Sequence, residues 1–124
     1  MVARRTPPIP SVERAALVGL ATPASRGATD ASLDELARLA DAAGATVVLR
    51  MVQERPRPDP ATFIGSGKVG ALAAACAEAD VDVVVFDNEL TPAQLRQIEE
   101  RVERKVIDRT QLILDIFARR ARTR

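Results

Sequence analysis

The chain has 124 residues, of which 47% are hydrophobic and 28% charged, and its formal net charge is +1. This composition is typical of one globular domain with a buried core, and no apolar run is long enough to cross a bilayer. Histidine is absent and cysteine occurs once, which excludes a Cys/His metal site, an intrachain disulfide and a histidine-activated nucleophile. The three phenylalanines are the only aromatic residues, so the base-stacking surfaces of common single-strand RNA modules are not expected either.

The N-terminal segment is rich in proline and lacks the apolar run of a signal peptide. We therefore expect an extended arm over residues 1–13, a single domain over residues 14–124 and a cytoplasmic location. The domain begins with a short apolar run over 14–20 that is typical of a buried strand. Ser32 and Glu35 then have the spacing of a capping box, which predicts a helix over 33–43.

The next two elements are a strand and a helix separated by a long loop. β-branched residues predict a strand over 46–52. The loop that follows, 54–68, begins by alternating proline with charge, which disfavours ladder pairing and is typical of functional or mobile segments. Apolar residues at helical spacing then predict an alanine-rich helix that ends near residue 79. Its single thiol, Cys76, is expected to be an inert core residue.

The last part of the chain repeats the same alternation of strand and helix. The nearly continuous apolar run over 81–86 is typical of a central strand covered on both faces. Thr91 and Gln94 form a second capping box, with proline at the first helical position. A short strand over 105–107 precedes a last helix whose apolar stripe is Leu112, Ile113, Ile116 and Phe117.

The predicted order is therefore βαβαβαβα, which indicates an α/β fold with a four-stranded, mostly parallel sheet and helices on both faces. In such a sheet the strand-to-helix loops meet at the carboxyl edge, where open α/β folds bind their ligands. The functional residues are therefore expected in those loops.

One candidate is a glycine-rich helix start, formed by Gly65, Ser66, Gly67 and Lys68. Glycines allow backbone amides to face an anion, and a lysine adds positive potential, so this segment is a weak candidate for phosphate or nucleotide binding. A Walker loop is excluded, because Thr62 stands where its first glycine belongs and Val69 where its metal-binding hydroxyl belongs. The alternative is a glycine-enabled helix start with a solvated lysine.

A second candidate is the polar group expected at the sheet edge, namely Asp87, Asn88, Glu89, Asp108 and Arg109. Asp87 stands where a receiver domain carries its phosphorylated aspartate, but the acidic pair that a receiver needs after its first strand is missing. The alternative is loop and capping chemistry. We predict no metal site, because a Mg²⁺ ion on Asp87 and Glu89 would need further oxygen ligands.

The third candidate is a basic C-terminal segment. Residues 109–124 carry five arginines against one aspartate, a net charge of +4, whereas the rest of the chain has a net charge of −3. Arginines gathered in this way either bind a polyanion such as RNA or stabilise the negative end of a helix dipole. The candidate RNA contacts are Arg119, Arg120, Arg122 and Arg124.

Three spaced segments resemble the N-terminal domain of the HflX-type ribosome-associated GTPases, and the resemblance runs from about residue 14 to the end. The segments are FIGSGK at 63–68, DNELTPAQ at 87–94 and VIDRTQLILDIFARRART at 106–123. The resemblance implies a parent GTPase that binds the large ribosomal subunit and dissociates stalled or idle ribosomes. In that parent, this domain would precede a helical hairpin and a G domain.

The chain contains neither a GxxxxGK[ST] loop nor an NKxD motif, so we expect a truncated piece without enzymatic activity of its own. GTP and Mg²⁺ would belong to the G domain, and this chain would hold no cofactor. The resemblance also implies ATP binding at the loop-rich edge, without identifying residues.

Three functions therefore remain open. The domain docks onto the large ribosomal subunit and its RNA by electrostatic contacts, binds an adenine nucleotide or another small anion at Gly65–Lys68, or only supports the G domain. No DNA or membrane partner is expected.

Overall fold

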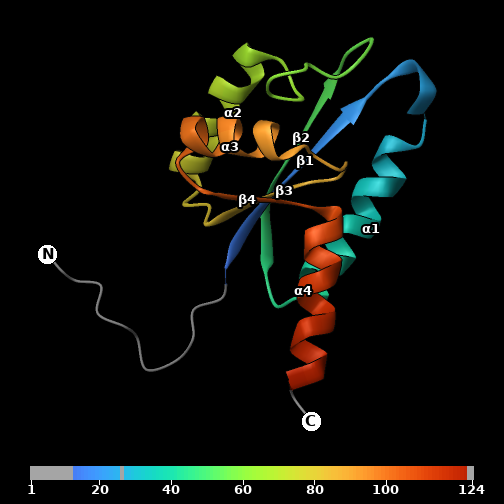
Figure 1. Ribbon diagram of the computed structural model, residues 1–124, viewed down its shortest axis with the longest axis vertical. Helices are drawn as coiled ribbons and strands as arrows, with labels where there is room; N and C mark the ends of the chain where they lie inside the picture. The colour runs from blue at the N-terminus through green and yellow to red at the C-terminus, as the bar shows by residue number, and fades with distance from the viewer. Residues whose placement is uncertain (1–12, 26, 123–124) are drawn as a thin grey trace, which may run out of the picture.

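The computed structural model describes residues 13–25 and 27–122, so the predicted arm lies almost wholly outside the described residues. The elements alternate between strand and helix as predicted (Figure 1). The described residues also include one 3-10 turn, η1. In chain order the elements are β1 (Arg14–Ala21), η1 (Pro23–Ser25), α1 (Thr29–Ala42), β2 (Thr46–Glu54), α2 (Ser66–Glu78), β3 (Val83–Phe86), α3 (Pro92–Val102), β4 (Lys105–Asp108) and α4 (Arg109–Arg122).

The four strands form one sheet in the order β2-β1-β3-β4, and every pair is parallel. This confirms the predicted fold class. Val18 pairs with Phe86, and Phe86 pairs with Asp108, so β3 and β4 end in register, whereas β1 continues to Ala21 and ends beside Glu54 of β2. The loops after β3 and β4 therefore start side by side, and so do the loops after β1 and β2.

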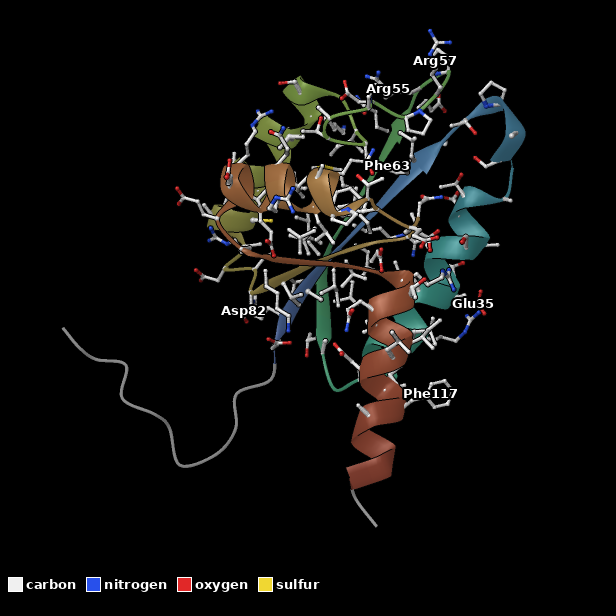
Figure 2. The ribbon with its side chains drawn as sticks, viewed as in Figure 1. Glu35, Arg55, Arg57, Phe63, Asp82 and Phe117 are labelled. Atoms are coloured by element: carbon white, nitrogen blue, oxygen red, sulfur yellow. The ribbon has the colours of Figure 1, made fainter. Side chains whose placement is uncertain are left out.

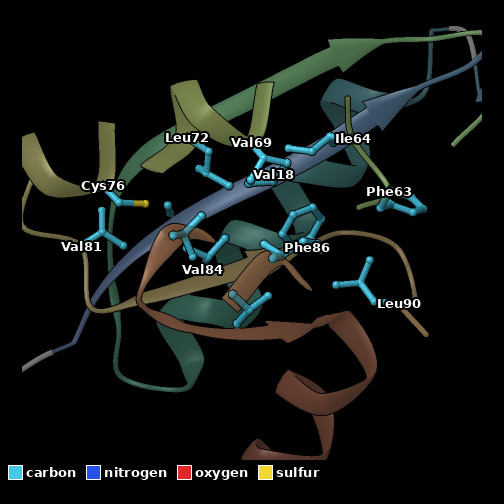
Figure 3. Packing of buried hydrophobic residues seen from close by; sticks show 14 of the residues in the cluster. Val18, Phe63, Ile64, Val69, Leu72, Cys76, Val81, Val84, Phe86 and Leu90 are labelled. Atoms are coloured by element: carbon cyan, nitrogen blue, oxygen red, sulfur yellow. The ribbon is translucent and has the colours of Figure 1, made fainter. Parts of the chain in front are cut away.

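Helices cover both faces of the sheet, as the apolar run of β3 predicts. Alternate residues of β1 and β3 point to opposite faces, because successive side chains of a strand do so. One face packs against α2 and α3 in a cluster that includes Val18, Leu72, Phe86 and Ile98 (Figure 3). The other face packs against α1 and α4 in a cluster that includes Leu17, Leu33, Leu36, Val85 and Leu112.

The start of α1 corrects the sequence prediction. The helix begins at Thr29, one turn before the predicted start, and its N-cap is Ala28, whose side chain makes no capping bond. Gly27, at φ 80°, turns the chain into the helix, and the Ala28 amide donates to the Ser25 carbonyl. The capping box predicted at Ser32 is therefore wrong.

The start of α3 confirms its predicted capping box, and the start of α4 is also capped. Thr91 Oγ1 accepts from the Gln94 amide at 3.1 Å, and Gln94 Oε1 accepts from the Thr91 amide at 2.9 Å, which completes a capping box. Asp108 Oδ1 accepts from the Gln111 amide at 3.0 Å and so caps α4.

Within the described ranges, no helix has the length and apolar character that a membrane crossing requires.

Candidate functional site

Arg109 ties together the carboxyl edge of the sheet. Its guanidinium donates to Asp87 Oδ1 at 2.7 and 3.1 Å, and to the carbonyl and hydroxyl oxygens of Ser32 at 3.0 and 3.1 Å. It also forms an ion pair with Glu35 at 3.3 Å. The end of β3, the start of α4 and the middle of α1 are thus joined through one side chain.

These contacts give the predicted edge residues internal partners. The Asp87 side chain is only 7% exposed, and the Arg109 guanidinium neutralises the carboxylate that a receiver domain would phosphorylate. Asp108 is also buried, and both of its carboxylate oxygens accept backbone amides, from Leu90 and Gln111. Asn88 and Glu89 are exposed on the loop between β3 and α3. The geometry thus supports the loop and capping alternative for Asp87, Asp108 and Arg109.

The Gly65–Lys68 segment forms the first turn of α2. Gly65 is the N-cap in an extended conformation, and its amide donates to Gln53 Oε1 at 2.8 Å. One of the amides that an anion nest would use is therefore already engaged. Lys68 is half-buried, and no carboxylate of the described residues lies within 4.0 Å of its ammonium group. Anion binding at this turn stays a prediction.

Asp59 holds the proline-rich loop between β2 and α2 in one shape. Its Oδ1 accepts the amides of Ala61 and Thr62 at 2.8 and 3.1 Å, and its backbone exchanges two hydrogen bonds with Phe63. The two side-chain bonds hold the pKa of Asp59 below its usual value, with a smaller contribution from Arg55, while burial opposes the shift.

Two more contacts fix this loop against the domain. Gln94 Nε2 on α3 donates to the carbonyl oxygens of Asp59 and Pro60 at 3.2 and 3.3 Å. Phe63 is buried edge-on against Phe86, with ring centroids 6.1 Å apart, at a positive φ of 65°. A bulky residue in that backbone region is strained and persists only where its surroundings hold it. The loop is therefore an ordered element.

Arg55 and Arg101 are candidate residues that the sequence analysis missed, and both approach the start of α2. Arg101 on α3 donates to the hydroxyl and carbonyl oxygens of Ser66 at 2.9 and 3.0 Å. Arg55 Nη1 lies 2.8 Å from the position that a Cβ on Gly65 would occupy. The alternation of arginine with proline could have indicated Arg55 as a candidate, whereas no local sequence pattern indicates Arg101.

A pocket of about 660 Å³ opens at the carboxyl ends of β1 and β2. Its charged lining consists of Asp30, Glu54 and Arg55, and none of the predicted site residues is among those that line it. Two carboxylates beside one guanidinium do not favour a polyphosphate, because like charges repel an anion.

The predicted RNA contacts lie at the end of α4. Arg119, Arg120 and Arg122 belong to the last turns of this helix, and Arg124 lies outside the described residues. Backbone position alone therefore places three of these arginines together, near the C-terminal end of the helix dipole.

Comparisons with known proteins agree with the resemblance. A family described as GTP-binding GTPase N-terminal matches residues 30–118. GTPase HflX of Lacrimispora saccharolytica is 46% identical over 112 residues, which cover 90% of this chain and 26% of that protein. GTPase HflX of Escherichia coli is 45% identical over 91 residues, which cover 73% of this chain and 21% of that protein. The chain thus spans about a quarter of the length of its curated relatives.

Solved structures confirm the fold. The complex of SsGBP with GDP superposes with a TM-score of 0.67 at 18% identity, over 91% of this chain and 31% of that chain. A GTP-binding protein of Sulfolobus solfataricus in complex with GDP gives a TM-score of 0.61 at 18% identity, over 86% of this chain and 30% of that chain. The family match over residues 30–118 and the identity to the HflX relatives show that the chain belongs to the GTP-binding GTPase N-terminal family and is an HflX N-terminal domain.

Proposed function

We propose that this domain docks a longer HflX-type GTPase onto the large ribosomal subunit by contacting ribosomal RNA phosphates. Membership of the HflX family supports the class of parent protein. The observation that carries the docking role is the concentration of arginine at the end of α4, where Arg119, Arg120 and Arg122 fall within four residues. Positive charge gathered at one end of a domain favours a polyanion.

Binding of this kind would be directed to phosphates and would be largely independent of RNA sequence. Phe63 and Phe86 are buried, and the chain has no tyrosine or tryptophan. Phe117 is the exposed aromatic ring among the described residues, so base stacking adds at most one contact. Phosphate contacts release counterions, so binding that depends on them weakens steeply as salt increases.

The test is binding to purified large ribosomal subunits across a salt series. Replacing Arg119, Arg120 and Arg122 by glutamine should lower affinity and flatten the log–log salt slope by about 0.7 to 0.9 for each phosphate that the variant no longer neutralises. A matched control removes three positive charges elsewhere, with Arg38→Gln, Arg96→Gln and Lys105→Gln, and should keep the wild-type slope. Identical slopes for the wild type and the Arg119 triple variant would contradict RNA docking through α4 and would favour a purely supporting role.

GTP hydrolysis is assigned to another part of the parent protein. The residues of this chain do not fit a GTP and Mg²⁺ site, because Val69, at the position of the metal-binding hydroxyl, is fully buried in the core. Purified protein should show no multiple-turnover phosphate release from GTP above a mock preparation.

Small-anion binding at Gly65–Lys68 is tested separately with ATP. Bound ligand raises the melting temperature, so Lys68→Ala should reduce an ATP-dependent rise if the turn holds the phosphates. A rise that Lys68→Ala leaves unchanged would place the nucleotide elsewhere, and no rise at all would exclude this alternative function.

A further inference from the structure

Four cationic side chains gather where the proline-rich loop meets α2 and α3, and we call them the loop-end cluster: Arg55, Arg57, Lys68 and Arg101. Arg55 Nε donates to the Arg57 carbonyl at 3.1 Å, and Arg55 Nη1 lies beside Gly65. Arg101 contacts the next residue, Ser66, and Lys68 follows in the same helical turn. Three separate segments of the chain therefore contribute positive charge to one place.

Most of this charge has no internal counter-ion. Among the described residues, no carboxylate lies within 4.0 Å of the charged groups of Arg57, Lys68 or Arg101. Arg55 is 4.0 Å from Asp59 Oδ2, and Glu54 is the other carboxylate on this stretch of chain. Asp30 also lines the pocket beside Arg55. The four cations of the cluster thus outnumber three neighbouring carboxylates.

The cluster is also held in place before any partner binds. Asp59 and Gln94 fix the loop by the hydrogen bonds described above, and Phe63 is anchored in the core. Prolines on both sides of Arg57 restrict the backbone at the exposed turn. A partner that contacts a fixed loop has less conformational entropy to remove, so preorganisation favours binding.

We infer that the loop-end cluster is a second RNA-docking surface of this domain, which contacts the phosphate backbone. The inference rests on the proposed docking function and extends it to a part of the domain remote from the arginines of α4. Figure 2 shows Arg55 and Arg57 at the end of the molecule where β2 terminates, and Phe117 of α4 toward the opposite end. The two surfaces can therefore be altered independently.

Charge favours RNA over a protein partner at this surface. Protein interfaces depend on aromatic or aliphatic side chains buried at their centre. Among the described residues, the exposed large hydrophobic side chains are Leu114 and Phe117, and both belong to α4. The loop-end cluster instead presents cations among prolines, glycines and a serine, and cations of this kind bind phosphates.

The first arm of the test removes charge. Arg57→Gln combined with Lys68→Gln should weaken binding to purified large subunits and lower the salt slope by about 1.4 to 1.8, as expected when two phosphates are no longer neutralised. The matched control, Arg38→Gln with Lys105→Gln, removes the same charge from α1 and from the opposite edge of the sheet and should keep the wild-type slope. Melting temperatures of both variants should equal that of the wild type, because all four side chains lack ion pairs among the described residues.

The second arm adds charge. A Cβ on Gly67 would meet open space, and the residue lies in the first turn of α2, beside Lys68. Gly67→Arg should therefore tighten binding and steepen the salt slope by about 0.7 to 0.9. Ala74→Arg, on an exposed position two turns further along the same helix, should leave the slope unchanged.

The possible outcomes show whether the second surface fails alone or together with the proposed docking function. A wild-type slope for the Arg57 and Lys68 variant, with a flattened slope for the α4 triple variant, would overturn the second surface and keep the docking role. Absence of wild-type binding to large subunits would overturn both. A reduced slope on intact subunits with an unchanged slope on purified large-subunit RNA would assign the cluster to an acidic ribosomal protein and overturn the RNA contact.

Discussion

Arg109 donates two hydrogen bonds to one oxygen of Asp87, at 2.7 and 3.1 Å, across the carboxyl edge of the sheet. The Asp87 side chain is 7% exposed and that of Arg109 is 23% exposed, so the pair is largely withdrawn from water. The same guanidinium reaches Ser32 and Glu35 on α1. This arrangement connects β3, α4 and α1 through a single side chain.

Arg109→Gln should therefore lower the free energy of unfolding by about 3 kcal/mol, because it leaves the Asp87 carboxylate buried without a counter-ion. Asp34→Asn is the control, since it breaks an ion pair with Arg50 in which Asp34 is 57% exposed. That change should cost less than about 1 kcal/mol. Urea unfolding of both variants measures the difference, and equal losses of stability would contradict a buried, stabilising role for Arg109.

A second prediction compares two potential helix caps. Thr91→Ala should cost about 1 kcal/mol, because it leaves the Gln94 amide at the start of α3 without its acceptor. Ser32→Ala should change stability little, since Ser32 lies inside α1 and its hydroxyl only shares Arg109 with other acceptors. Urea midpoints of the two alanine variants provide the measurement, and a larger loss of stability at Ser32 would restore the cap that the sequence predicts.

The order of elements could be predicted from the sequence because each strand and helix carries its own periodicity and most carry their own stop signals. The start of α1 could not, because Ser32 and Glu35 have the spacing of a cap inside a helix that already began at Thr29. Capping motifs are short, so a chance match one turn inside a helix has the same local sequence pattern as a true cap.

The candidate site was less predictable than the fold, because its geometry depends on contacts between distant segments. Arg109 was a candidate, but its partners Asp87 and Ser32 are 22 and 77 residues away in the chain. Arg101 reaches Ser66 only because α3 packs beside α2, which no local pattern indicates. The positive φ of Phe63 likewise depends on its burial against Phe86.

A third prediction concerns acid stability. Hydrogen bonds from Ala61 and Thr62 lower the pKa of Asp59 in the folded protein. A carboxyl group whose folded pKa is depressed stabilises the fold above its unfolded pKa, about 3.9, and loses that contribution as pH falls through the folded pKa. The difference in unfolding free energy between wild type and Asp59→Asn should therefore be constant near neutral pH and change only below about pH 4. A carboxyl NMR titration of Asp59 with a midpoint at or above the ordinary value would contradict this.

The last prediction concerns α4, some of whose apolar side chains are not covered by the rest of the described domain. Leu112 is buried and Ile116 packs against the core, whereas Leu114 is 54% exposed and Phe117 is 62% exposed. Figure 2 shows Phe117 directed away from the sheet on the projecting part of this helix. Apolar side chains exposed together favour association, because burying them removes their surface from water.

Sedimentation velocity should therefore show the wild-type chain associating as its concentration rises. Leu114→Gln with Phe117→Gln should keep the chain monomeric without lowering its melting temperature, because neither side chain belongs to the core. Leu112→Ala is the contrasting variant: it should leave association in place and cost about 2 to 5 kcal/mol of stability, since it opens a cavity in the core. A wild-type chain that stays monomeric at high concentration would show that α4 exposes too little apolar surface to drive association, and association unchanged in the Leu114 and Phe117 variant would place the interface on another face.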